Sequence, residues 1–263
     1  MNKKYIDISY ANTVTNWDLV RKNVDGVIIR VGYRGYSAGN IKEDAKFATN
    51  IKCAAACNIP IGAYFMSQAI NNVEAEAEAD YCYEKLKKYN IVLPVCYDSE
   101  LSNPKGNGRA DNLTIAQRTA ICKAFCDRIQ QHGMRAGVYA STSWFKSYLN
   151  VADLNDYILW VAQYNPKCTA THRVDMWQYT SRGSISGIAG NVDISECYIE
   201  FGSTVLAQPE QSADAKKNLY WITAGDVWTM EEAIAAKESF ESKYPGIPLG
   251  IRRANLTDVE ALG

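Results

Sequence analysis

An acidic pair follows an apolar, strand-like run in the first half of the chain. Residues 95–97 (Val-Cys-Tyr) precede Asp98 and Glu100, which are separated by one serine. In an extended chain, residues two positions apart point to the same side, with backbones about 6.6 Å apart. We therefore expect Asp98 and Glu100 to face one cavity. Because neighbouring carboxyl groups raise each other's pKa, one is able to act as a general acid while the other is an anion.

This division of roles is the one that glycoside hydrolysis requires. Carboxyl groups about 5–5.5 Å apart favour retention and about 6.5–9.5 Å favour inversion, and the two-residue spacing does not choose between them. Two other interpretations of the pair stay open. The acids are either loop residues that cap the next helix or hard oxygen ligands for magnesium or calcium. The sequence has no acidic loop with calcium-type spacing, and we expect neither a metal nor a cofactor.

The elements around the pair alternate between strand and helix. Apolar runs predict strands at residues 5–8, 27–31, 60–66, 93–97, 134–139, 157–162, 174–179 and 192–194. Three- and four-residue spacing predicts helices at residues 16–23, 41–57, 72–88, 114–131 and 142–149, with Asn16 as a cap and Gly133 as a stop. Five strand–helix units followed by strands with little helix between them predict a mainly parallel, closed α/β barrel.

Further acids and several aromatic residues lie near the ends of these strands, where parallel barrels collect reactive groups. Asp7 ends the first strand and Asp193 lies on the last, so closure of the barrel should bring them together. Rings beside acids suit a polysaccharide groove, although core packing is an equal alternative for each ring. The aromatic residues are Tyr33, Tyr64, Tyr139, Trp160, Tyr164, Trp177 and Tyr179.

Composition narrows the functional classes. The net charge of −1 argues against a nucleic-acid partner, which a basic surface would mark. No apolar run approaches the ~18 residues that span a bilayer, so we expect no membrane insertion. The eight cysteines include no Cys-x-x-Cys pair and are interpreted as reduced thiols. A Gly/Ser-rich loop at residues 183–190 lacks Walker spacing, which favours a simple turn over a phosphate site.

The domain organisation predicted from the sequence is a barrel at residues 1–202, a polar linker at 203–217 and a small β-α-β module at 218–263. The module is too short to bury a good core alone, so we expect it to dock, dimerise or pair with another unit. The two lysines near the N-terminus are not followed by an apolar signal-peptide core. The expectation is a protein that is made in the cytoplasm without a signal peptide.

Seven short segments, in this order, resemble glycoside hydrolase family 25, the lysozymes that cleave bacterial peptidoglycan. The resemblance covers about residues 4–200. The segments are 7–9 (Asp-Ile-Ser), 62–64 (Gly-Ala-Tyr), 97–100 (Tyr-Asp-Ser-Glu), 138–141 (Val-Tyr-Ala-Ser), 159–164 (Leu-Trp-Val-Ala-Gln-Tyr), 177–180 (Trp-Gln-Tyr-Thr) and 187–193 (Gly-Ile-Ala-Gly-Asn-Val-Asp).

The resemblance implies an irregular TIM-like (β/α)5β3 barrel that hydrolyses the β-1,4 bond from N-acetylmuramic acid to N-acetylglucosamine with retention. It implies Glu100 as the general acid and Asp98 as the group that stabilises positive charge, either as nucleophile or by orienting the substrate's N-acetyl group. Asp7 and Asp193 would shape the electrostatics. The residues expected to bind sugar are Tyr33, Tyr64, Tyr139, Trp160 and Gln178, of which Tyr33 rests only on its place at a strand end.

Two positions depart from the family pattern. Phe65 stands where many members have His, and Ser195 stands where many have Asn. The missing signal peptide and the small module resemble a phage or prophage endolysin, whose tail would bind the cell wall or form a homodimer. The alternative to a muramidase is a catalytically idle module that binds cell-wall polysaccharide.

Overall fold

The computed structural model describes residues 2–103, 105–201, 220–224 and 249–253. The chain divides into two units, residues 1–208 and 209–263, and each is described separately. In the second unit, β12 (Tyr220–Ala224) and β13 (Leu249–Arg253) pair in parallel, close to the two strands that the sequence predicts there. The predicted linker, the helix of the predicted β-α-β module and the wall-binding or dimerising role lie outside the described residues.

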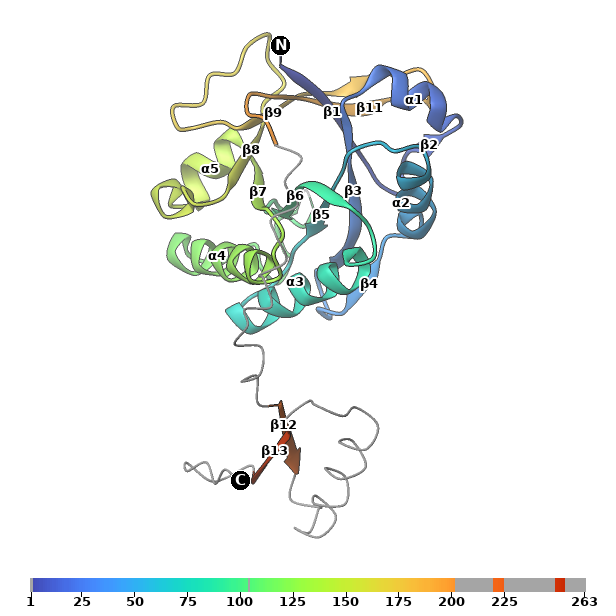
Figure 1. Cartoon of the computed structure of the whole chain (residues 1–263). Helices are drawn as coiled ribbons and strands as arrows, with labels where there is room; N and C mark the ends of the chain where they lie inside the picture. Colours follow the sequence, from blue (N-terminus) through green and yellow to red (C-terminus); the bar gives the residue numbers. More distant parts are fainter. Residues whose placement is uncertain (1, 104, 202–219, 225–248, 254–263) are drawn as a thin grey trace. The chain divides into compact units, whose positions relative to one another are not determined.

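Within the described residues of the first unit, eight strands close into a barrel (Figure 1), which confirms the predicted fold. The strands are β1 (Lys3–Ile8), β3 (Gly26–Arg34), β5 (Ile61–Met66), β6 (Ile91–Asp98), β7 (Ala136–Ser141), β8 (Ile158–Ala162), β9 (Met176–Gly183) and β11 (Val192–Cys197). Seven of the eight strands pair in parallel, one after another around the barrel, in the order β1, β3, β5, β6, β7, β8 and β9. Strand β11 closes the barrel between β9 and β1 and is antiparallel to both.

The reversed direction of β11 decides where Asp193 lies. Because β11 is antiparallel, its first residues lie at the edge where the parallel strands have their carboxyl ends. Asp193 is the direct cross-strand partner of Asp7 on β1. The chain thus brings together two acids that are 186 positions apart in sequence.

Helices of the described residues cover part of the circumference of the barrel and leave the side at β9 and β11 uncovered (Figure 1). They are α1 (Trp17–Asn23), α2 (Phe47–Ala56), α3 (Asn72–Leu86), α4 (Ile115–Gln131) and α5 (Thr142–Tyr148), followed by a 3-10 turn at Val151–Leu154. Four of the helices begin at a side-chain cap. Asn16, Asn71 and Ser141 accept a hydrogen bond from a backbone N–H in the first turn of α1, α3 and α5. Thr114 and Gln117 form a reciprocal capping box at α4.

The helix predicted at residues 41–57 is wrong at its start. Residues Ile41–Glu43 form β4, a short strand that is antiparallel to β3, and α2 begins at Phe47. Asp44 lies between them with its side chain fully buried, and its carboxylate accepts hydrogen bonds from Arg30 and from the Tyr10 backbone N–H. This tertiary ion pair fixes the chain at Asp44 and overrides the helical propensity of the segment before it.

The Gly/Ser-rich loop is a turn. Its strand β10 (Ile188–Ala189) pairs with β2 (Thr13–Val14). The carbonyl oxygen of Gly187 accepts hydrogen bonds from the backbone N–H groups of Thr15 and Asn16, at 2.8 and 3.1 Å. Gly187 has a φ of 96°, a left-handed conformation that favours glycine. The loop backbone therefore forms hydrogen bonds with residues 13–16, which agrees with a structural turn.

The core has two layers. The larger fills the space between the barrel and its helices, and Phe65, Phe125 and Phe145 are fully buried in it. The smaller fills the barrel interior and consists of Tyr5, Ile28, Leu93, Cys96, Trp160, Met176 and Cys197. Burial of each large apolar side chain stabilises the fold by about 1.5–3 kcal/mol. All eight cysteines are free thiols, as predicted.

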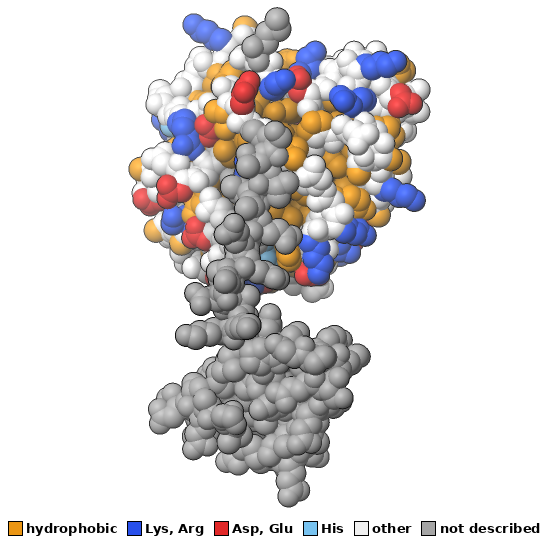
Figure 2. Space-filling model, viewed as in Figure 1, with side chains coloured by type: hydrophobic (Ala, Val, Ile, Leu, Met, Phe, Trp, Pro, Cys, Tyr) orange, Lys and Arg blue, Asp and Glu red, His pale blue; other side chains and the backbone are white. Residues whose placement is uncertain are grey.

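Cationic, anionic and apolar side chains are interspersed on the face of the first unit that Figure 2 shows, in keeping with the net charge of −1. Among the described residues, no helix combines the length and the apolar character that crossing a membrane requires.

Candidate active site

A cleft of about 230 Å³ opens at the carboxyl ends of the parallel strands. It collects all four acids that the sequence singles out and four of the five residues expected to bind sugar. The lining residues are Asp7, Tyr64, Asp98, Glu100, Tyr139, Trp160, Tyr164, Gln178 and Asp193. They come from seven strands and the segments that follow two of them, so the cleft exists only when the barrel is closed.

The alternation of the strands explains why the acids lie above the apolar interior. Tyr5 and Cys96 are part of the interior core, and Asp7 and Asp98 lie two residues further along the same strands. Asp98 ends β6 and is 4% exposed, whereas Glu100 lies beyond the strand and is exposed to solvent. The acidic pair thus contains one buried and one accessible carboxyl group.

Gln178 connects the two sides of the cleft. Its side-chain amide donates a hydrogen bond from Nε2 to Oδ2 of Asp7 at 2.9 Å. The hydroxyl groups of Tyr139 and Tyr164 both donate to its Oε1, at 3.0 and 2.9 Å. Gln178 is itself buried, so this network holds the Asp7 carboxyl and both tyrosine rings in place.

Burial raises the pKa of all four carboxyl groups. For Asp7 the pKa lies well above its ordinary range, because burial and the nearby charge of Asp193 outweigh the hydrogen bond from Gln178. Burial and the charge of Glu100 raise the pKa of Asp98 well above its ordinary range, against a lowering effect of Arg30.

Glu100 and Asp193 are less enclosed than the other two acids. Desolvation by the cleft walls raises the pKa of Glu100, Arg30 lowers it, and Asp193 raises it. Desolvation also raises the pKa of Asp193 itself. The cluster therefore keeps its protons to a higher pH than isolated carboxyl groups do, which favours general acid catalysis.

One oxygen of Asp98 has no hydrogen-bond partner among the described residues. This atom, Oδ1, is buried. Leaving a buried polar group unpaired costs about 1–3 kcal/mol. An ionised carboxylate oxygen in this position is suited to stabilising positive charge that develops in the cleft.

Trp160 supports the cleft from below. Its side chain is 1% exposed, and its ring meets those of Tyr139 and Tyr64 edge-on, with centroids 4.6 and 6.5 Å apart. The indole N–H donates to Oγ of Ser195 at 3.0 Å. Ser195, which departs from the family pattern, therefore fixes the tryptophan ring.

Phe65, the other departure, does not line the cleft. It lies in the core layer between the barrel and the helices, where its ring packs against Tyr81 of α3 at 6.2 Å. The position is next to Tyr64 on β5, but alternate residues of a strand face opposite sides. Its effect on sugar contacts is therefore indirect.

The structure places three of the singled-out aromatic residues outside the cleft. Tyr33 lies in a neighbouring cavity, and Trp177 and Tyr179 contact each other elsewhere, with centroids 5.6 Å apart. Tyr164, by contrast, lines the cleft and was missing from the expected sugar-binding residues. Its place after a strand end was the available signal.

Arg30 is the residue of electrostatic importance that the sequence reasoning missed. It lowers the pKa of both Asp98 and Glu100 from β3, where it pairs with Asp44. A single charged residue inside the otherwise apolar run 27–31 was the signal. Within the described part of the chain, no group of three or more His, Cys, Asp or Glu side chains is arranged to hold a metal ion.

The fold and the cleft define a class of protein: a mixed α/β barrel with a carboxyl cluster, held by amide and tyrosine partners, at the carboxyl ends of its strands. The sequence profile of Glycosyl hydrolases family 25 matches residues 6–188. The chain therefore belongs to glycosyl hydrolases family 25.

Individual relatives agree with this assignment. The chain is 32% identical over 216 residues to an autolytic lysozyme of Clostridium acetobutylicum, a match that covers 80% of this chain and 61% of the relative. The modular autolysin LytC from Streptococcus pneumoniae, solved with a synthetic peptidoglycan ligand, superposes with a TM-score of 0.65 at 32% identity. That match covers 75% of this chain and 47% of LytC.

A third relative shows the fold alone. The catalytic domain of endolysin ply40 from bacteriophage P40 of Listeria monocytogenes superposes with a TM-score of 0.62 at 23% identity, covering 78% of this chain and 98% of the domain. The chain thus spans about 61% of the curated relative's length and about half the length of LytC.

Proposed function

We propose that the protein is a peptidoglycan hydrolase that cleaves the β-1,4 bond between N-acetylmuramic acid and N-acetylglucosamine with retention. The observation that carries this proposal is the placement of one buried and one accessible carboxyl group, Asp98 and Glu100, in one cleft. Family membership and the peptidoglycan ligand of LytC support it.

In the proposed reaction, Glu100 donates its proton to the glycosidic oxygen as the bond to the anomeric carbon breaks. The Asp98 carboxylate stabilises the positive charge, either by bonding to the anomeric carbon or by orienting the substrate's N-acetyl group toward it. Glu100 then takes a proton from the water that completes hydrolysis, which regenerates the acid. Tyr64, Tyr139 and Gln178 line the cleft in which the reacting sugar ring would bind.

In the proposed mechanism the active state of the Asp98–Glu100 pair carries one proton, and the raised pKa of both groups supports that state at a higher pH than ordinary carboxyl groups would have it. Activity should fall at low pH as Asp98 gains a proton and at high pH as Glu100 loses one. Because burial raises the pKa of both groups, both limbs move to higher pH than the ordinary values of these residues suggest.

Turbidity loss of Gram-positive cell walls, measured together with new reducing ends, tests this function. We expect wild type to clear walls and Glu100→Gln to lose clearing while still binding them. Equal clearing by both proteins would show that Glu100 is not the acid. Wall binding without new reducing ends in wild type would instead favour the idle binding module.

We further propose a phage or prophage endolysin, made in the cytoplasm and released to the cell wall, with the C-terminal module binding the wall or forming a homodimer. The endolysin relative supports a barrel of this kind, although its similarity extends only to the fold. Light scattering during size exclusion of the full chain tests self-association, and a monomer at all concentrations would exclude the dimer.

A further inference from the structure

Glu100, the general acid of the proposed function, lies on a segment whose direction its own contacts do not set. It follows the end of β6, is exposed to solvent and lines the cleft beside Asp98. Among the described residues, neither its backbone nor its carboxyl group forms a hydrogen bond. The direction of its side chain therefore depends on the residues that hold the chain on either side of it.

Ser99, between the two acids, is the first of these residues. The pairing of β6 with β7 ends at Asp98 and Tyr139. The Ser99 backbone N–H then donates to the carbonyl oxygen of Tyr139 at 2.9 Å, which adds one bond beyond the end of β6. Alternate residues of an extended segment face opposite sides. A Ser99 side chain that faces the helices therefore directs its two neighbours toward the cleft.

Trp144, on α5, holds the Ser99 side chain on the side of the helices. Its indole N–H donates to Oγ of Ser99 at 2.9 Å, and both side chains are buried. Trp144 belongs to the core layer between the barrel and the helices. Because a buried polar group that loses its partner carries the full cost of desolvation, the hydrogen bond keeps both groups in this geometry.

Arg118, on α4, supports the tryptophan ring. Helices α4 and α5 lie side by side outside β6 and β7 (Figure 1). The guanidinium group lies over the ring of Trp144, 4.8 Å from its centroid. Arg118 is 4% exposed, and its Nε has no hydrogen-bond partner among the described residues. A buried cation is attracted to the face of an aromatic ring, so this contact fixes the position of the indole.

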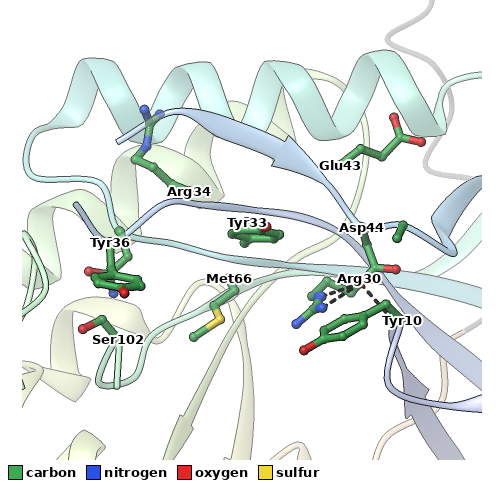
Figure 3. A pocket seen from close by; sticks show the side chains of 11 residues that line it. Tyr10, Arg30, Tyr33, Arg34, Tyr36, Glu43, Asp44, Met66 and Ser102 are labelled. Atoms are coloured by element: carbon green, nitrogen blue, oxygen red, sulfur yellow. Dashed lines mark hydrogen bonds and ion pairs between the residues drawn. The ribbon is translucent and has the colours of Figure 1, made fainter. Parts of the chain in front are cut away.

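The same arginine also reaches the segment after Glu100. It donates to the carbonyl oxygen of Asp111 at 3.0 Å. The Asp111 carboxylate accepts hydrogen bonds from the backbone N–H and the hydroxyl of Ser102, at 3.0 and 2.6 Å. Ser102 lines the neighbouring cavity of about 330 Å³, together with Tyr33 (Figure 3), whereas Glu100 lines the cleft. The chain thus leaves the cleft after Glu100 and is held on both sides of it.

We propose that Trp144 is a positioning residue for the general acid. Through its hydrogen bond to Ser99, it holds the segment after β6 so that the carboxyl group of Glu100 faces the cleft beside Asp98. Trp144 is not among the residues that line the cleft, so it acts without contacting the substrate. This inference rests on the proposed function, because it takes Glu100 as the proton donor.

Trp144→Phe and Ser99→Ala, made in the full chain, test the inference, because each removes one partner of the hydrogen bond and no charge. Release of reducing ends from soluble glycan strands measures kcat and KM. We expect kcat to fall by about 10–100-fold with KM unchanged, since misplacing a reacting group by about 1 Å costs up to about 10²-fold. The double variant should lose no more than either single variant, because the shared interaction is already absent.

Trp177→Phe is the matched control. Trp177 is 7% exposed and Trp144 is 6% exposed. The indole N–H of Trp177 donates to the carbonyl oxygen of Gln163 at 2.8 Å, so the same change removes an equivalent hydrogen bond at a residue that does not line the cleft. This variant should keep the wild-type kcat. Thermal unfolding will verify that every variant is folded at the assay temperature.

Three kinetic results would overturn the inference. They are a wild-type kcat in both Trp144→Phe and Ser99→Ala, losses that multiply in the double variant, and an equal loss of kcat in Trp177→Phe. Each would show that the hydrogen bond between Trp144 and Ser99 serves the fold and not the placement of Glu100.

Crystal structures of the wild type and of Trp144→Phe give a measure that does not depend on activity. We expect the Glu100 carboxyl group to move by about 1 Å relative to Asp98, the displacement that the expected loss of kcat implies. An unmoved carboxyl group would also overturn the inference. The proposed function fails separately, if Glu100→Gln clears walls as fast as wild type. In that case the two crystal structures would still decide whether Trp144 positions Glu100.

Discussion

Replacing Asp98 with Asn should make the fold more stable at neutral pH while it abolishes catalysis. The Asp98 side chain is 4% exposed and its Oδ1 has no partner among the described residues, so the fold carries the cost of a buried, incompletely bonded carboxyl group. Asn has the same shape and no charge. We expect a gain of about 1–3 kcal/mol in the free energy of unfolding at pH 7.

The sign of this effect follows from the raised pKa. The unfolded chain loses the Asp98 proton near the ordinary value of 3.8, whereas the folded protein keeps it to higher pH. Between those two pH values the folded state binds more protons, so wild-type stability falls as pH rises. The advantage of Asp98→Asn should therefore be small near pH 4 and should grow toward neutral pH.

Thermal unfolding followed by circular dichroism between pH 4 and pH 8 measures this difference. For a unit of about 200 residues, the expected gain corresponds to a rise in Tm of about 2–12 °C. Asp156→Asn makes the same chemical change at an exposed position and should leave Tm nearly unchanged. A lower Tm for Asp98→Asn at pH 8, or the same shift at pH 4 and pH 8, would refute the reasoning.

Three further predictions address other parts of the site. Glu100→Gln should lower kcat by about 10²–10⁴-fold with little change in wall binding, and release of reducing ends measures this. Arg30→Met should shift both limbs of the pH profile upward, because Arg30 lowers the pKa of both acids of the pair. It should also destabilise the fold by about 3–5 kcal/mol, because the buried Asp44 carboxylate loses its partner of opposite charge. An unchanged pH profile would exclude the electrostatic role. Burial raises the pKa of Glu78 to about 7, so stability should fall as pH rises from about 4.5 to 7. Glu78→Gln should flatten that part of the pH–stability curve, and a curve identical to wild type would contradict the prediction.

The periodicity of the chain was enough to predict the barrel. Apolar runs and helical spacing located all eight strands and five helices, because each element buries one face or one stripe against its neighbours. Two predicted helix ends are also confirmed. Asn16 caps α1, and Gly133, with a φ of 76°, follows the end of α4. The start of α2 could not be predicted, since the chain at Asp44 is set by Arg30, which lies 14 positions earlier.

The acids of the site could be predicted from the sequence, because reactive groups of parallel α/β barrels lie at the carboxyl ends of the strands. The two-residue spacing of Asp98 and Glu100, which is a local property, predicts that they face one cavity, and both line the cleft. Tyr33 shows the limit of this reasoning. It lies near the end of a strand like the other aromatic residues, yet it lines a neighbouring cavity and not the cleft, because the place of a side chain around the barrel depends on how the strands pair, and β3 shifts register between Arg30 and Gly32.

By itself, the sequence determined the order of the barrel strands and helices and which carboxyl groups lie at strand ends, because both follow from local spacing. Only the tertiary structure decided how each carboxyl group ionises and what it contacts. Asp98 is buried and Glu100 is exposed, so their carboxyl groups ionise in different surroundings. The reversed strand β11 brings Asp193 to Asp7, and Arg30 lowers the pKa of both Asp98 and Glu100 from another strand. Desolvation and charge interactions depend on distances through space, which the order of residues along the chain does not contain.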